Sequence, residues 1–229
     1  MLSEPAAAAN AYAVDEHLRE EGNVVVLHVG GGTAEASVLT LVDGAYEALG
    51  LEYDPFFGGQ DLDRRIVDHF VGLVRNKHGK DISNDSAAMD KLRTACERAK
   101  KTLSHQDDAR VTVESLVDGV DLAEPLTRAE FEELNHDLFL KVVELVDKAV
   151  SQARDYYMDS KLVIDEVVLI GGSTMIPKVR ELVRDYFGGT KELNTRIKPD
   201  EVVTIGAVEY SKWIYSKRRS ALLARRELS

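Results

Sequence analysis

Two runs of apolar residues in this chain end abruptly in glycines, and a hydroxyl side chain follows each set of glycines. Residues 24–29 read VVVLHV and precede GGGT at 30–33, whereas residues 167–170 read VVLI and precede GGST at 171–174. Glycines at the end of a strand leave backbone N–H groups unshielded by a Cβ atom, which suits a phosphate or a flat base. A tight hairpin also requires glycine, so one run is weak evidence. The pair favours a nucleotide held from two sides.

The spacing of the other apolar positions predicts an α/β protein that begins with an antiparallel meander of three strands. Strands are expected at residues 24–29, 36–42, 45–52, 110–116, 120–122 and 166–170, with a short edge strand around Ile197. The first strand is apolar on both faces, which places it at the centre of the sheet. Asp43 and Gly44 form a favoured hairpin dipeptide after the second strand.

Helices are expected between and after these strands. Helical spacing or helix-start residues occur at residues 6–17, 62–77, 88–103, 177–187 and 199–213. Thr127 and Glu130 make a capping box that opens a further helix running close to Tyr157, as one rod or as two pieces. The order of elements predicts an α/β unit at residues 1–57 and 137–216, an inserted α+β unit at 58–136, and a tail at 217–229. The tail is basic and is interpreted as a solvated helical extension or a disordered segment, with a partner-binding helix as the alternative.

Composition narrows the classes of partner. The 229 residues carry 29 Lys and Arg against 40 Asp and Glu, a net charge of −11, and this acidic balance disfavours duplex nucleic acid or an anionic membrane as the main partner. No run is long and apolar enough to span a bilayer. The single cysteine, Cys96, lies on an apolar helix face and is expected to be a packed thiol. One cysteine permits no internal disulfide and fits a reducing compartment, here taken as the cytoplasm.

Several longer strings carry a resemblance to a known family. They are EP at 4–5 before an alanine run, GGGT at 30–33, GG at 58–59, KDIS at 80–83, LRTACERAK at 92–100, RAEFEELN at 128–135, GGST at 171–174 with IPK at 176–178, and KELN at 191–194. The chain resembles the second lobe of the ATPase domain of DnaK-type 70-kilodalton heat-shock chaperones. The resemblance implies the actin-like, ribonuclease-H-like fold, with a sheet layer (IIA) and an inserted subdomain (IIB).

In that family ATP lies in a cleft between two lobes, and the resemblance assigns three groups of contacts. The second phosphate loop would consist of Gly30, Gly31, Gly32 and Thr33. Adenine and ribose would meet one helix face that carries Glu97, Lys100, Lys101 and Ser104. The adenosine loop would consist of Gly171, Gly172 and Ser173, with Met175 beside the base and Asp200 near the phosphates. Without the resemblance, spacing alone favours a solvated stripe with an internal Glu97–Lys101 pair, and Ser173 or Asp200 as a helix cap.

The chain departs from the family at positions that bear on chemistry. His28 stands where the family has an acidic residue that orients metal-bound water, and an imidazole does not supply a fixed anion there. Met175 replaces an arginine that stacks on adenine, and Lys101 replaces its arginine partner, so the planar guanidinium pair is absent. The resemblance covers only the second lobe, and phosphoryl transfer depends on positioning groups from both lobes. We therefore assign no catalytic residue and no metal-ligating residue.

Two functions of different classes follow from these observations. The leading one is a nucleotide-binding lobe that binds ATP or ADP weakly in isolation, takes Mg²⁺ only with the nucleotide, and hydrolyses little. Unfolded proteins would be partners only through domains outside this sequence. The alternative is a non-catalytic interaction module that binds nucleotide-exchange factors or co-chaperones through the inserted subdomain. An actin-like structural protein or a sugar kinase would share only the fold, and the strings at 92–100 and 128–135 count against it.

Overall fold

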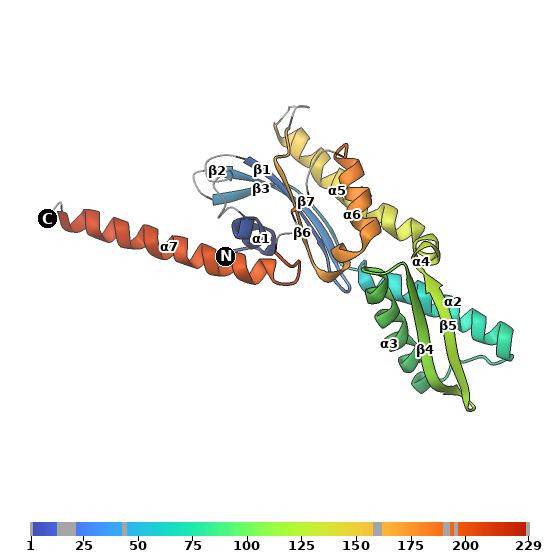
Figure 1. The fold of residues 1–229 in the computed structure, drawn as a ribbon. Coiled ribbons are helices and arrows are strands. Elements are labelled where there is room, and N and C mark those ends of the chain that lie inside the picture. Colours follow the sequence, from blue (N-terminus) through green and yellow to red (C-terminus); the bar gives the residue numbers. More distant parts are fainter. Residues whose placement is uncertain are drawn as a thin grey trace.

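The computed structural model describes residues 2–12, 22–42, 45–157, 162–189, 193–194 and 197–227, with side chains up to residue 215 in the last segment. The helices are α1 (Glu4–Tyr12), α2 (Gly59–His78), α3 (Ser86–Leu103), α4 (Arg128–Leu134), α5 (His136–Tyr157), α6 (Pro177–Tyr186) and α7 (Val202–Glu227). The strands are β1 (Gly22–Val29), β2 (Ala34–Val42), β3 (Ala45–Asp54), β4 (Asp108–Val117), β5 (Val120–Thr127), β6 (Glu166–Ile170) and β7 (Leu193–Asn194). The structure is therefore a mixed α/β protein (Figure 1).

The main sheet has the strand order β3-β2-β1-β6-β7. Strand β1 pairs antiparallel with β2 and parallel with β6, so the expected meander and the central position of the first strand are confirmed. The prediction of an edge strand at Ile197 was wrong, because the edge pairing to β6 is made by Leu193 and Asn194. Asp43 and Gly44, the predicted hairpin turn, lie outside the described residues.

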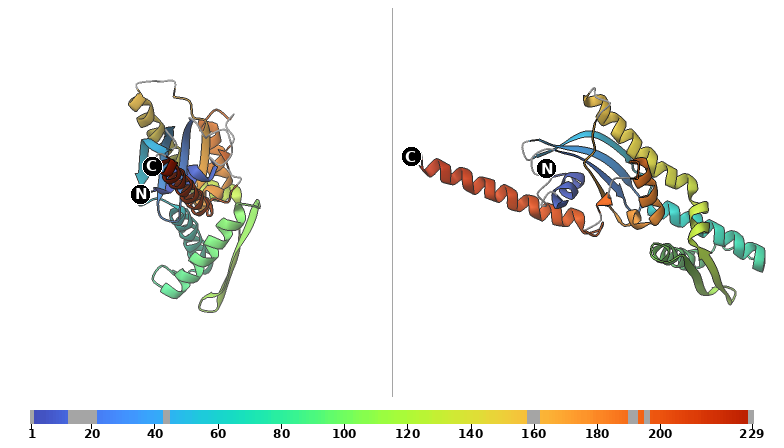
Figure 2. Two further views of the ribbon diagram at one scale, coloured as in Figure 1. Left: turned by 90° about the vertical axis from the view of Figure 1, so that its left-hand side faces the viewer. Right: turned by 45° about the horizontal axis from the view of Figure 1, so that its top comes forward.

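Helices cover both faces of this sheet (Figure 2). Residues of β1 that point to one face, such as Val25 and Leu27, belong to a core that includes α5 and α6. Val24 and Val26 point to the other face and pack with Ala8 of α1. Helix α7 lies against α1 through Gly206, where a Cβ atom would come within 1.7 Å of the Ala7 carbonyl oxygen. Close backbone approach of these two helices therefore requires glycine at position 206.

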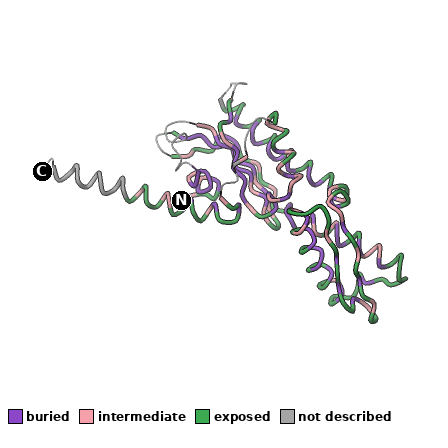
Figure 3. The backbone as a smooth tube through the Cα atoms, in the orientation of Figure 1, coloured by how far each residue is buried: buried purple, intermediate pink, exposed green. Residues whose placement is uncertain are grey.

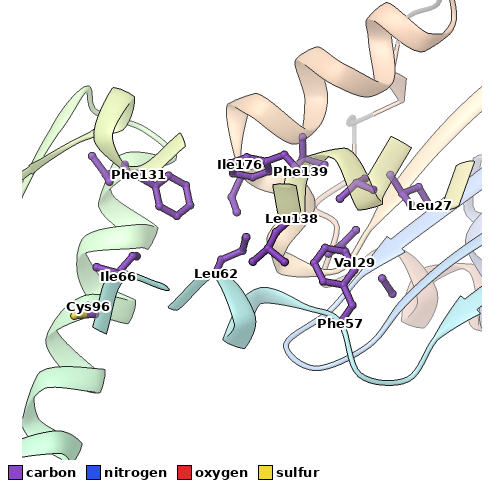
Figure 4. Packing of buried hydrophobic residues seen from close by; sticks show 14 of the residues in the cluster. Leu27, Val29, Phe57, Leu62, Ile66, Cys96, Phe131, Leu138, Phe139 and Ile176 are labelled. Carbon is purple, nitrogen blue, oxygen red and sulfur yellow. The ribbon is translucent and has the colours of Figure 1, made fainter. Parts of the chain in front are cut away.

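The second part of the molecule consists of α2, α3 and the β4–β5 ribbon, with α3 packed on β4 (Figures 1 and 3). Its apolar residues are continuous with the core beneath the sheet. Figure 4 shows how Leu62 of α2 and Phe131 of α4 approach Leu138 and Ile176, which belong to α5 and to the loop before α6. The boundaries of the two predicted units stay predictions, since one apolar core connects them.

The structure settles one helix break that the sequence left open and moves the end of another helix. The helix opened by Thr127 is two pieces, because α4 ends at Leu134 and Asn135 separates it from α5. Its capping box is present, with Thr127 Oγ1 accepting from Glu130 N at 3.1 Å. Helix α7 continues to Glu227 rather than ending near residue 213, and it projects away from the sheet (Figure 1). Residues 214–227 contain neither glycine nor proline, so nothing in the local sequence stops the helix.

Candidate nucleotide site

Four segments that are distant in sequence meet at one end of the main sheet. They are the turn between β1 and β2, the first turn of α2, the second half of α3, and the loop between β6 and α6. Between them lies a pocket of about 290 Å³. It is lined by Gly30, Gly31, Gly59, Gln60, Asp63, Glu97, Lys100, Lys101, Ser104, Gly172, Ser173 and Ile176. Both glycine loops and the charged helix face singled out from the sequence are therefore brought together.

The first glycine loop is tied to its neighbours by backbone hydrogen bonds. The Gly30 carbonyl oxygen accepts from Gly59 N at 2.9 Å, and the Gly31 carbonyl oxygen accepts from Gln60 N at 2.7 Å. Ser173 Oγ also donates to the Gly30 carbonyl oxygen, at 3.0 Å, and so joins the two loops. A Cβ atom on Gly58 would come within 2.7 Å of Gly31 backbone atoms. The close approach of the two backbones therefore requires glycine at position 58.

The second glycine loop contains two residues with opposite surroundings. Gly171 has φ +85°, and a Cβ atom there would come within 2.5 Å of the Val29 carbonyl oxygen. Its N–H donates to the Pro199 carbonyl oxygen at 3.0 Å. Gly172 has no other described atom within 4 Å of a Cβ position, and it lines the pocket. Gly171 is therefore required by the fold, whereas Gly172 leaves open space in front of the backbone.

Lys100 is held inside the pocket wall rather than extending into solvent. Its Nζ donates to the Gly59 carbonyl oxygen at 2.8 Å and to Asp63 Oδ2 at 2.6 Å. Burial raises the pKa of the Asp63 carboxyl, and this effect outweighs the opposing attraction of the Lys100 ammonium. Asp63 Oδ1 is buried and accepts no hydrogen bond from any residue that the structure describes.

Glu97 and Lys101 form the pair that spacing alone predicted. Lys101 Nζ lies 2.6 Å from Glu97 Oε1, with 71% and 49% of the two side chains exposed. The hydrogen bond from Lys101, followed by its charge, lowers the pKa of Glu97. Both residues also line the pocket, so the solvated pair and a ligand-facing position coexist. Ser104 caps the end of α3.

Some residues singled out from the sequence lie beside this pocket rather than in its wall. Gly32 lines an adjoining hollow of about 750 Å³, which shares Gln60, Asp63 and Glu97 with the pocket. The Thr33 carbonyl oxygen accepts from Gly30 N at 2.9 Å and closes the turn. Met175 is half-buried at the end of a short 3₁₀ turn (Gly172–Met175). Asp200 is exposed and follows Pro199, whose carbonyl oxygen accepts a hydrogen bond from Gly171 N.

His28 lies where the two glycine loops meet. A Cβ atom on Gly30 would be 3.0 Å from its Nε2, and one on Gly171 would be 2.7 Å from its Cδ2. In the register of the sheet His28 is the partner of Glu35 on β2 and of Ile170 on β6. Among the residues that the structure describes, no three His, Cys, Asp or Glu side chains are grouped as metal ligands.

Four residues of the pocket wall were not identified from the sequence as site residues: Gly59, Gln60, Asp63 and Ile176. A signal was available, because positions 59, 60 and 63 lie on one face of the first turns of α2. Gly58 and Gly59 were noted as a matching pair, but nothing in their spacing showed which helix face would meet α3. That relation is a property of the packing.

Similarity to known proteins extends over most of the chain. The family described as Hsp70 protein matches residues 1–216. The chain belongs to the Hsp70 family. It is 55% identical over 207 residues to a heat shock 70 kDa protein named BIP3 from Oryza sativa subsp. japonica, and 47% identical over 209 residues to heat shock cognate 70 kDa protein 3 from Dictyostelium discoideum. A heat shock 70 kDa protein from Neurospora crassa is 44% identical over 207 residues.

The match covers most of this chain but a minor part of its relatives. In these three comparisons 90% of the chain is aligned, against 30%, 32% and 31% of the relatives. The chain thus corresponds to part of an Hsp70 chaperone and spans about a third of the relatives' length. In the described part of the chain, no helix combines the length and apolar character of a membrane span.

Proposed function

We propose that this chain is the second lobe of an Hsp70-type ATPase domain and that it binds the adenosine end and part of the phosphates of ATP or ADP. The observation that carries the proposal is the convergence of four separate segments on one pocket, lined by both glycine loops and by the charged face of α3. A solvated stripe on α3 would not require the β1–β2 turn and the β6–α6 loop to lie opposite it. The family membership supports the same ligand.

The pocket offers distinct groups to distinct parts of a nucleotide. Open backbone at Gly172 suits the flat face of a purine, because no side chain separates the ligand from the chain. Lys100 and Glu97 supply a donor and an acceptor for ribose hydroxyls or ring nitrogens. Gly30 and Gly31 present the end of β1 to the phosphates. Mg²⁺ would come with the nucleotide, because this ion is usually held by substrate phosphates and one or two carboxylates rather than by a dedicated protein cage.

We expect little hydrolysis by this chain alone. Catalysis of phosphoryl transfer comes almost entirely from positioning and charge stabilisation around the terminal phosphate. His28 supplies no fixed negative charge at the junction of the two loops. The chain also spans about a third of the length of its relatives, so in an assay of this chain alone the rest of an Hsp70 chaperone supplies no groups around the terminal phosphate. A steady-state phosphate-release assay with ATP and Mg²⁺ tests this, and turnover equal to that of an intact Hsp70 chaperone contradicts it.

Calorimetric titration with ADP tests the binding proposal. Gly172→Val places a side chain in the open space of the pocket and should abolish the measured heat without unfolding the protein. Gly72→Val is the matched control, because Gly72 also has open space around it among the described residues but lies outside the pocket, within α2. The control should bind ADP as the wild type does. Equal binding by both variants contradicts the proposed site.

A second function remains as the outcome of a negative titration. That function is a non-catalytic module that binds nucleotide-exchange factors or co-chaperones through the inserted subdomain, on which the Glu97–Lys101 pair of α3 is exposed. If ADP gives no heat while a purified nucleotide-exchange factor binds the chain, the non-catalytic interaction module replaces the nucleotide-binding lobe. Loss of that binding on removal of the β4–β5 ribbon would assign it to the second part of the molecule.

A further inference from the structure

The Lys100–Asp63 pair differs from the other ion pairs of the described residues in its burial. Only 11% of the Lys100 side chain and 17% of the Asp63 side chain are exposed. Both acceptors of the ammonium, the Gly59 carbonyl and the Asp63 carboxylate, belong to the first turns of α2, whereas Lys100 belongs to α3. Two of the three N–H donors of Lys100 are thereby given fixed directions, and the third is left for the pocket.

The same pair is poorly arranged for stability. Asp63 Oδ1 is buried without a hydrogen-bond donor among the described residues, which costs free energy that a fully satisfied carboxylate would not. Cys96 lies one turn before Lys100 on α3. Burial, and to a smaller extent the negative charge of Asp63, raise the pKa of the Cys96 thiol to about 12. A charged pair kept in such surroundings, at the wall of a pocket, indicates a role in ligand binding rather than in folding.

We propose that Asp63 is the positioning residue for Lys100: by holding the ammonium against α2, it directs the remaining donor of Lys100 at the ligand in the pocket. The inference rests on the proposed nucleotide site and adds a residue to it that acts through another side chain. It also assigns the chemistry of the contact. The part of the ligand opposite Lys100 must carry a hydrogen-bond acceptor, such as a ribose hydroxyl or a ring nitrogen.

The neighbouring pair on α3 shows what Lys100 would be without its anchor. Lys101 pairs with Glu97 along its own helix, and most of its side chain is solvated. A lysine in that state has many rotamers to lose when it binds a ligand. Lys100 has already lost them in the folded protein, so its contact with the ligand costs less conformational entropy.

A double-mutant cycle measured with ADP tests this role. Asp63→Asn keeps the shape of the side chain but removes the charge, and Lys100→Met removes the ammonium. We expect Asp63→Asn to weaken ADP binding by about tenfold and the double variant to bind no more weakly than Lys100→Met alone, because coupled residues are not additive. Asp63→Glu, which restores a carboxylate, should recover part of the affinity. Full additivity of the two single changes overturns the proposal.

A matched control is available in an ion pair whose lysine belongs to α2. Glu124 of β5 accepts from Lys77 of α2 through both oxygens at 2.9 Å, but this pair lies away from the pocket. Glu124→Gln removes a carboxylate from a lysine on another element and should leave ADP binding unchanged. Thermal unfolding of each variant separates a loss of affinity from a loss of the fold.

A readout without nucleotide separates this inference from the proposed function. The Lys100 ammonium, fixed by two hydrogen bonds, should give a slowly exchanging NMR signal in the wild type that disappears in Asp63→Asn. An unchanged signal overturns the positioning role whatever ADP does. A signal that depends on Asp63 in a protein that does not bind ADP overturns the proposed function instead, and with it the ligand contact.

Discussion

The two glycine loops look alike in sequence but do different things in the structure. The loop after β1 is enclosed: its carbonyl oxygens accept from the first turn of α2 and from Ser173. The loop after β6 is split, because Gly171 is pressed against β1 while Gly172 faces open space. Glycine thus serves close backbone packing at some of these positions and an empty surface for a ligand at another.

This difference decides which glycines a ligand explains. Gly58 and Gly171 each stand where a Cβ atom would collide with backbone, so the fold alone accounts for them. Gly172 and Gly31 meet no such obstacle, since the nearest atom to a Cβ on Gly31 is the Gln60 side-chain nitrogen at 3.7 Å. Gly31 and Gly172 both line the pocket, so a ligand there would explain glycines that backbone packing does not. Substitution at the two kinds of glycine should therefore separate stability from binding.

The largest effect is expected at Gly171. Alanine there would adopt φ +85° and meet the Val29 carbonyl oxygen at 2.5 Å. Strain and collision together should lower the free energy of unfolding by on the order of 3 kcal/mol. Gly172→Ala, which meets no described atom within 4 Å, should change it by less than about 0.5 kcal/mol. Urea denaturation followed by circular dichroism measures both, and equal losses would show that the two positions are not different.

Much of this comparison was accessible from the sequence. The apolar runs located β1 and β6, and their glycine ends located both loops, because strand burial and glycine punctuation are local signals. The helical spacing of positions 97, 100, 101 and 104 gave the face of α3 that lines the pocket. These elements are confirmed, whereas the role of the residues in nucleotide binding stays a prediction.

What the sequence did not give depends on packing between elements. Asp63 became a site residue only when α2 lay against α3, because the helical spacing of positions 59, 60 and 63 does not show which element their face meets. The sequence shows no obvious break between Thr127 and Tyr157, which fits one rod or two pieces, whereas the structure breaks the helix at the buried Asn135. The predicted final helix and the predicted helical tail form one element, α7, because no glycine or proline in residues 214–227 separates them.

A smaller effect is expected at the contact that joins the loops. Ser173→Ala removes the hydrogen bond from Ser173 Oγ to the Gly30 carbonyl oxygen, which keeps its second donor, Gly59 N. Because no buried group is left without a partner, the loss of stability should be about 1 kcal/mol. Ser211→Ala, which removes a bond of the same kind within α7, is the control for the loss of a hydroxyl. A loss at position 173 no larger than at 211 would mean that the loops are held by backbone bonds alone.

The smallest effect concerns the pH dependence that Asp63 gives to the enclosed side of the pocket. Burial raises the pKa of Asp63 above its ordinary value of 3.8, so between the two values the folded protein binds more protons than the unfolded chain. Stability must then fall as the pH rises through that window. Asp63→Asn removes this contribution. Between about pH 4 and about pH 7, the free energy of unfolding of the wild type should therefore fall relative to that of the variant, by roughly 1 kcal/mol or less. Urea denaturation of both proteins at the two pH values measures the difference, in which the other carboxylates cancel. If the free energy of unfolding of the variant instead falls relative to that of the wild type as the pH rises, the attraction of the Lys100 ammonium outweighs burial. The Asp63 carboxylate is then stabilised in the folded protein, as surface carboxylates in ion pairs are.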